Sequence, residues 1–389
     1  MTELISLPQE LFDLIIDQLF DDLESLRACA LVCSNFLPSS RAHIFSHLRV
    51  GPLDQENTID GLQGILARFP HLTARVQSLH LWDHIMRRHS WIAEWPESLA
   101  PGVARFLPTL VSLKRFAITI EAGFVHWANV SDALSTSVHA VLSAQTLTDL
   151  ELTGLYGLPF ELFANCPALK SATLKWVTFD ERDNFDFAMT LAACAGSPLT
   201  LLTHLSLDLD TRVLELLSRW ILLPESPLKI TQLVSFVCTL DGRFDYVTVL
   251  RLLGDCAQTL QHFQLRSTDG IFDLSDLVSL RTLRIDTIAP LAPWVQWLAA
   301  SITLRQSVSL VISMEAENWS PELLKLAEAD AALAQFNSIG SVTLILVPQK
   351  NVDRERDLID VSRAFADRMP SLAGKGALRV LRSLHFPVA

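Results

Sequence analysis

The sequence predicts an α/β protein, with a short helical head at the N-terminus followed by an irregular solenoid that has a parallel sheet and outer helices. The first fifty residues carry apolar residues at helical spacing, and more of them than so short a segment can bury. After residue 64, runs of strict apolar and polar alternation start every 20 to 37 residues. One strand plus one helix or loop per unit of that length is typical of a solenoid.

The first predicted helix opens at Pro8, because a proline in the first turn loses only an N–H that has no helical partner, and runs to about Phe20. Its apolar residues cover well over half of the helix circumference, which leaves Asp13 and Asp17 to face water. Such a stripe is too wide for one packing face, so it needs a further cover. The apolar residues are Leu11, Phe12, Leu14, Ile15, Ile16, Leu19 and Phe20.

Two more short helices complete the head. Asp21 followed by Glu24 has the form of a capping box, which predicts a second helix from about Asp22 that ends before Pro38. A third helix over residues 40–48 adds another apolar edge. The three short helices predict a helical domain at residues 1–50, and the polar, glycine-containing stretch that follows predicts a linker at residues 51–64.

The head carries the run Leu7-Pro8-x-x-Leu11, then Ile15, Leu19 and Leu26, then Leu31-Val32-Cys33-x-x-Phe36, and closes on Ile44-Phe45. This pattern resembles an F-box, with Phe36 and Phe45 at positions where many members have Trp. The resemblance implies docking onto the Skp adaptor, and through it a cullin, of a Skp–cullin–F-box ubiquitin ligase. The alternative is an ordinary helical hairpin that packs on its own domain. The residues that the resemblance assigns to adaptor binding are Leu7, Pro8, Leu11, Ile15, Leu19, Leu26, Leu31, Val32, Cys33 and Phe36.

Residues 65–389 are predicted to form the solenoid domain. Because crossover helices connect parallel strands, outer helices are expected between the strands, at residues 138–144, 214–222, 247–256, 294–302 and 323–336. The predicted strands are residues 78–82, 115–119, 149–153, 171–175, 204–208, 235–239, 262–266, 282–286, 309–313 and 341–345, with 381–386 as a further candidate.

Leucines lead into several of these strands, as in Leu147-Thr-Asp-Leu150 and Leu202-Thr-His-Leu205. This pattern resembles the Leu-x-x-Leu-x-Leu core of a leucine-rich repeat. The asparagine or cysteine that usually follows the strand in such repeats is mostly absent here, so the units are expected to be irregular.

The composition limits the classes of partner. The chain has 389 residues, half of them hydrophobic and 19% charged, with a net charge of −12. A general nucleic-acid binder would need clustered Lys and Arg, so proteins are the expected partners, with neither nucleic acid nor membrane among them. No secretion signal or membrane-length apolar run is found, and the six cysteines are scattered as reduced thiols are, which predicts a cytoplasmic or nuclear protein.

No enzyme motif rises above background. Glycine-rich phosphate loops, a Gly-x-Ser-x-Gly elbow and zinc-spaced Cys and His pairs are all missing, and Cys29 and Cys33 alone do not predict a metal. Asp208 and Asp210 are expected to be surface charges, and residues 82–95 a tryptophan-containing loop. The sequence therefore predicts a non-catalytic protein without cofactors.

The function expected from both resemblances is a substrate-recognition adaptor, whose solenoid binds a client protein for ubiquitination. The rival is an interaction scaffold without ubiquitin-ligase association, in which the head is a dimerisation hairpin. The predicted client contact is Gln264 beside Arg284 and Arg266 beside Asp286 on neighbouring strands. Asp286 is expected to pair with Arg266, which leaves Arg284 to bind an acidic or phosphorylated segment. A solvated face without a partner is the alternative.

Overall fold

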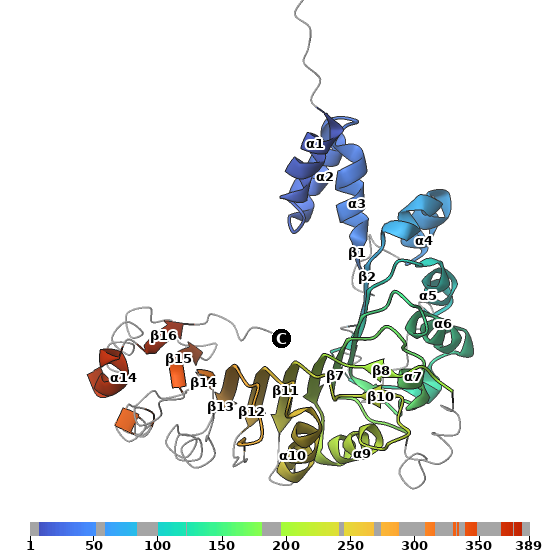
Figure 1. Cartoon of the computed structure of the whole chain (residues 1–389). Coiled ribbons are helices and arrows are strands. Elements are labelled where there is room, and N and C mark those ends of the chain that lie inside the picture. The colour runs from blue at the N-terminus through green and yellow to red at the C-terminus, as the bar shows by residue number, and fades with distance from the viewer. Residues whose placement is uncertain are drawn as a thin grey trace, which may run out of the picture. The chain divides into compact units, whose positions relative to one another are not determined.

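The computed structural model describes residues 8–51, 59–83, 100–121, 123–180, 196–240, 245–267, 274–287, 308–315, 330–331, 333, 339–347, 367–375 and 377–382. The protein is α/β, and the strands of its main sheet pair in parallel (Figure 1). The chain divides into two compact units, the first Met1–Leu169 with Phe179–Glu181, the second Lys170–Thr178 with Arg182–Ala389.

Three helices open the first unit, α1 (Gln9–Asp17), α2 (Leu23–Val32) and α3 (Leu37–Ser46). The predicted start of the second helix near Asp22 is confirmed. Asp22 is itself the cap, since its Oδ1 accepts the backbone N–H of Ser25 at 3.0 Å, whereas the sequence pattern had pointed to Asp21. Pro38 lies in the first turn of α3, where proline is tolerated, so α3 begins and ends earlier than predicted.

The sheet of the first unit begins directly after the head. Strand β1 (His47–Val50) follows α3 without an intervening residue and pairs in parallel with β2 (Ser78–Asp83), which pairs with β3 (Arg115–Ile120) and then β5 (Asp149–Thr153). The sequence prediction had placed residues 47 and 48 in a helix and residues 51–64 in a linker. Helix α4 (Ile59–Arg68) instead occupies the last part of that linker.

Short elements connect these strands, and α4, α5 and α6 lie on one side of them (Figure 1). Gly154 ends β5 with a φ of +73°, and a Cβ there would lie 2.4 Å from the Ile120 carbonyl oxygen, so only glycine fits this turn. The connecting elements are η1 (Pro70–Arg75), α5 (Ala100–Phe106), η2 (Leu107–Thr109), β4 (Val125–His126), η3 (Trp127–Asn129), α6 (Asp132–Leu142), β6 (Leu155–Tyr156) and α7 (Glu161–Ala164).

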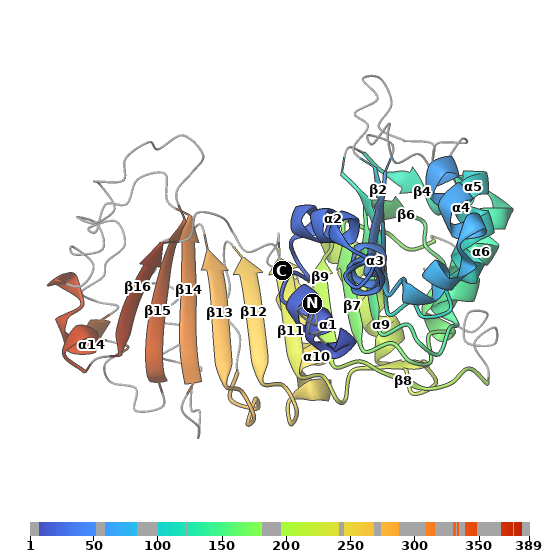
Figure 2. The same ribbon diagram turned by 90° about the horizontal axis from the view of Figure 1, so that it is seen from above.

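Among its described residues, the second unit contributes eight strands to the main sheet, in sequence order and paired in parallel, and Figure 2 shows β11 to β16 side by side. Helices α9 (Thr211–Ile221) and α10 (Asp245–Cys256) pack together beside the strands. Two short strands, β8 (Thr200–Leu201) and β10 (Leu228–Lys229), pair with each other in a separate sheet, and α14 (Pro370–Gly374) precedes β16. The strands of the main sheet are β7 (Ser171–Lys175), β9 (His204–Asp208), β11 (Ser235–Leu240), β12 (His262–Ser267), β13 (Thr282–Thr287), β14 (Val308–Glu315), β15 (Ile339–Val347) and β16 (Leu378–Arg382).

The ten predicted strands are confirmed, and three of the predicted outer helices correspond to α6, α9 and α10. The further candidate at 381–386 was misplaced, because β16 begins at Leu378, and residues 383–386 lie outside the described residues. The predicted helix at 294–302 also lies outside them, as does most of the one at 323–336.

The alternation of the strands places one apolar set in the core. In β9, Leu205 and Leu207 are buried while Ser206 and Asp208 on the other face are half-buried, and the same pattern holds in β7 and β11. Register pairs Leu207 with Leu174 on one side and Cys238 on the other. Apolar rows therefore run across the strands, as the period-two pattern requires.

We expect Leu207→Ala to lower the free energy of unfolding by about 2–5 kcal/mol, because a fully buried leucine leaves a cavity between two neighbouring strands. Urea denaturation followed by circular dichroism measures the loss. Ser206→Ala, one residue away on the other face, is the control. A loss for Leu207→Ala below about 0.5 kcal/mol, typical of exposed sites, would contradict this placement.

Candidate protein-docking sites

Helix α1 turns its polar side toward α3. Gln9, Asp13 and Asp17 stand four residues apart on α1, and each contacts a residue 26 positions later. Asp17 is exposed, as predicted, whereas Asp13 is half-buried. The prediction missed that α3 and the loop before it supply polar partners to these side chains at the same four-residue spacing. The three contacts are Gln9 Nε2 to the Asn35 carbonyl oxygen at 2.7 Å, Ser39 Oγ to Asp13 Oδ1, and His43 Nε2 to Asp17 Oδ1 at 2.7 Å.

This polar ladder fixes how α1 is rotated about its axis. The hydroxyl of Ser39 and then the amide of Gln9 donate to Asp13, and these hydrogen bonds hold the pKa of its carboxyl below the ordinary value. Only Ile16 on α1 is buried, and Phe12 meets Phe36 edge to face with ring centroids 5.3 Å apart. The rest of the wide apolar stripe therefore has to point away from α3.

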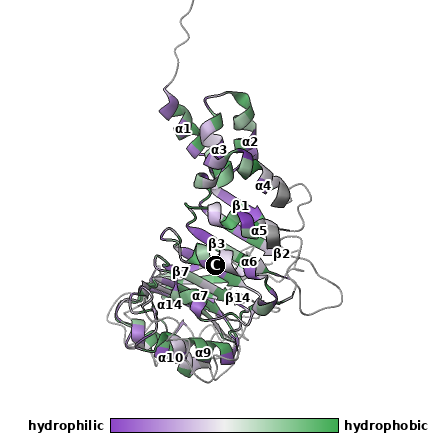
Figure 3. Cartoon of the chain, turned by 90° about the vertical axis from the view of Figure 1, so that its right-hand side faces the viewer, coloured by the Kyte–Doolittle hydropathy of each residue, from purple (hydrophilic) through white to green (hydrophobic). Residues whose placement is uncertain are grey.

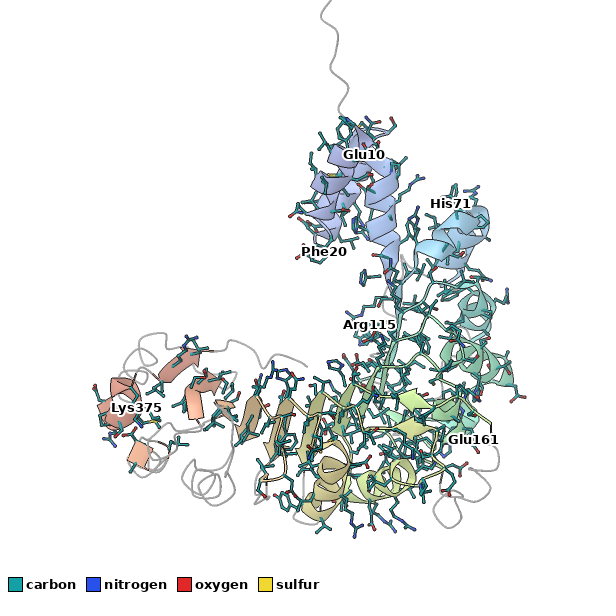
Figure 4. The ribbon with its side chains drawn as sticks, in the orientation of Figure 1. Glu10, Phe20, His71, Arg115, Glu161 and Lys375 are labelled. Carbon is teal, nitrogen blue, oxygen red and sulfur yellow. The ribbon has the colours of Figure 1, made fainter. Side chains whose placement is uncertain are left out.

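The head exposes a large share of its apolar side chains, on α1, on α2 and in the turn between them. Leu31 is 88% exposed, Val32 68% and Phe20 65%, values that are unusual for such residues in a folded domain. Figure 3 colours these helices by hydropathy, and Figure 4 labels Glu10 and Phe20 near opposite ends of α1. The exposed large hydrophobic residues of the head are Leu11, Leu14, Ile15, Phe20, Leu23, Leu31 and Val32.

Most residues expected to bind the adaptor lie on the surface of the head. Leu19 and Phe36 are half-buried, and Leu7 lies outside the described residues. Leu26 is the correction: it is 1% exposed, so it packs inside the head, where it supports the helices and is not available for contact. The motif did not single out Leu14, Phe20 and Leu23, although their apolar character was visible. The exposed members of the set are Pro8, Leu11, Ile15, Leu31, Val32 and Cys33.

The predicted client contact in the second unit has the expected register but different pairing. Gln264 lies opposite Arg284 and Arg266 opposite Asp286, as predicted. Asp286, however, accepts from Arg284 Nε at 2.9 Å and from Gln264 Nε2 at 2.7 Å. The prediction that Arg284 lacks a carboxylate was therefore wrong, because residues two apart on one strand share a face and the Arg284 side chain reaches along its own strand.

The Asp286 cluster is structural in character. Asp286 is only 4% exposed, and both of its oxygens have a donor. The Asp286 carboxylate thus forms an ion pair with Arg284, whose side chain is itself mostly buried. Arg284 is therefore not the uncompensated cation on which the predicted client contact depended.

A second polar cluster lies on the sheet of the first unit. The Arg49 guanidinium stacks over the Trp82 ring at 4.2 Å from the ring centroid, and His80 Nε2 lies 2.9 Å from Thr119 Oγ1. Burial, and then the charge of Arg49, lower the pKa of His80, while Glu151 and Glu121 act in the opposite direction. These effects together favour the neutral form of His80, and the cluster is held by stacking and hydrogen bonding.

The described residues contain no group of three or more His, Cys, Asp or Glu side chains that could hold a metal ion. Burial raises the pKa of the Cys166 thiol to about 12, and burial with the charge of Asp255 does the same for Cys256. Neither thiol is a nucleophile at neutral pH. In the parts of the chain that the structure describes, every helix is too short or too polar to span a bilayer.

Comparisons with known proteins identify no family for this chain. No family model matches the chain, and a search of curated proteins finds no significant match.

We expect Asp286→Ala to lower the free energy of unfolding by about 3 kcal/mol, because it leaves the largely buried Arg284 without its carboxylate. Chemical denaturation measures the loss, and Asp276→Ala, an exposed carboxylate in the same unit, is the control. An unchanged stability would show that the cluster is not structural and would return Arg284 to the list of docking residues.

Proposed function

We propose that the protein is a substrate-recognition adaptor of a Skp–cullin–F-box ubiquitin ligase. In this proposal the three-helix head is F-box-like and binds the Skp adaptor, and the strand-and-helix units that follow are a leucine-rich-repeat-like solenoid that binds a client protein. The protein itself carries no catalytic step, and the other subunits transfer ubiquitin.

The observation that carries the proposal is the rotation of α1. The polar ladder to α3 turns Leu11 and Ile15 outward, and at the end of α2 Leu31 and Val32 are 88% and 68% exposed. Burying these side chains stabilises a complex by roughly 25 cal/mol per Å² of apolar surface, a gain that the head alone does not obtain. The exposed positions are largely those that carry the F-box resemblance, which is why the Skp adaptor is the favoured partner.

The repeated units support the second half of the proposal. Within each compact unit, consecutive strands pair in register and in sequence order. Each strand with its connecting segment therefore adds one strand beside the last. Sheets built in this way expose one long face, and repeat proteins use such faces to bind other proteins. The half-buried polar positions, such as Ser206 and Thr173, belong to that face.

We expect Leu31→Glu with Val32→Glu to remove adaptor binding, because two carboxylates would have to be desolvated in the complex. Pull-down of purified Skp adaptor by the full chain measures binding, and thermal unfolding should stay close to that of the unmodified chain since both positions are exposed. Val247→Glu, an exposed helical valine of the second unit, is the matched control.

Two results would reject the proposal. If the unmodified chain does not bind the adaptor, the head is not an F-box and a scaffold without ubiquitin-ligase association becomes the better account. If the double variant binds as well as the Val247→Glu control, Leu31 and Val32 do not form the docking surface.

A further inference from the structure

The turn between α1 and α2 carries an apolar patch with acidic residues around it. We call Phe20, Leu23, Asp21 and Glu24 the head-turn patch. Both apolar side chains are exposed, at 65% and 44%, and both carboxylates are exposed as well. Asp22, which caps α2, adds a third carboxylate to this turn. The three carboxylates outweigh the positive charge of Arg27 on α2, so the local charge is negative.

A second exposed apolar patch of the first unit has the opposite charge. It is formed by Ile65, Arg68 and Phe69 at the end of α4, followed by His71 and Arg75 on η1, and we call it the α4 patch. Ile65, Arg68 and Phe69 have the helical spacing i, i+3 and i+4, and the Phe69 N–H donates to the Ile65 carbonyl oxygen at 2.9 Å, so the three side chains share one side.

The α4 patch is held in place and is uniformly basic. The rings of Phe69 and His71 meet edge to face with centroids 6.1 Å apart, and Figure 4 labels His71 at this end of the unit. Ile65 and Phe69 are exposed, and Arg68 and Arg75 are exposed beside them. No acidic residue occurs between Gly61 and Arg75.

We propose that the α4 patch of one molecule binds the head-turn patch of a second copy of this chain. Each patch presents two large apolar side chains flanked by charges of one sign, and the two signs are opposite. Complementary charges steer association and fix its register, while the apolar side chains supply the area that is removed from water. In a chain with a net charge of −12, the basic α4 patch is a local exception that favours an acidic partner surface.

The geometry of such a contact is head-to-tail, because two different patches meet. When two copies bind, one keeps its head-turn patch free and the other keeps its α4 patch free, so the contact produces rings or open chains of molecules. Two apolar side chains on each partner make a small interface, which predicts weak, concentration-dependent association. Salt weakens the charged part, since exposed charges are screened within about 8 Å at physiological ionic strength.

Charge reversal in the full chain tests this inference by sedimentation velocity over a range of protein concentrations at low salt. The unmodified chain is expected to show a mass that rises with concentration. Asp21→Lys with Glu24→Lys gives two basic patches, and Arg68→Glu with Arg75→Glu gives two acidic ones, so each double variant should remain monomeric. The variant that carries all four substitutions restores opposite signs and should associate again.

The fourfold variant also separates loss of contact from misfolding, because it contains every substitution that the two double variants carry. Arg251→Glu with Arg281→Glu, exposed arginines of the second unit, is the matched control and should associate like the unmodified chain. A monomeric unmodified chain at every concentration, association of either double variant, or failure of the fourfold variant to associate would each overturn the inference. None of these readouts requires the Skp adaptor, so the result does not depend on the proposed function.

Discussion

The rotation of α1 about its axis is the constraint on which the surface of the head depends. An amphipathic helix normally lowers its free energy by turning its apolar stripe inward. Here three polar contacts at a constant offset of 26 residues turn a polar edge of α1 toward α3, so only Phe12 and Ile16 among the apolar residues of α1 pack inward. The head therefore folds with apolar surface left over, and binding can recover the stabilisation that folding leaves unused.

The strands obey a different constraint, that of register. Since side chains alternate across a strand, a shift by one residue would move every leucine of a strand to the wrong face. The repeated pairing of apolar with apolar positions prevents such a shift, as with Leu174, Leu207 and Cys238. Polar residues on the other face are then free to vary, and some of them, such as Asp286 and Arg284, have become part of the fold instead of the surface.

The sequence allowed the strands to be located almost to the residue, because the alternation of apolar and polar residues along a strand is a local signal. Strand β1 was missed since four residues that follow a helix give only two alternations. The orientation of α1 was also missed, because helical periodicity separates polar from apolar residues without stating which side meets α3. The pairing of Asp286 could not be decided from sequence either, since Arg266 across the sheet and Arg284 along the strand are both within reach of one carboxylate.

The direct passage from α3 into β1 has a consequence for any attempt to study the parts separately. A truncation after residue 50 removes the head together with the strand that covers β2, because β1 is paired to β2 along its whole length. The new end of the sheet would present unpaired backbone N–H and C=O groups, with Leu79 and Leu81 beside them, to any neighbouring chain. Such a fragment is prone to aggregation through this edge, and its insolubility would say nothing about whether the remaining strands and helices can fold.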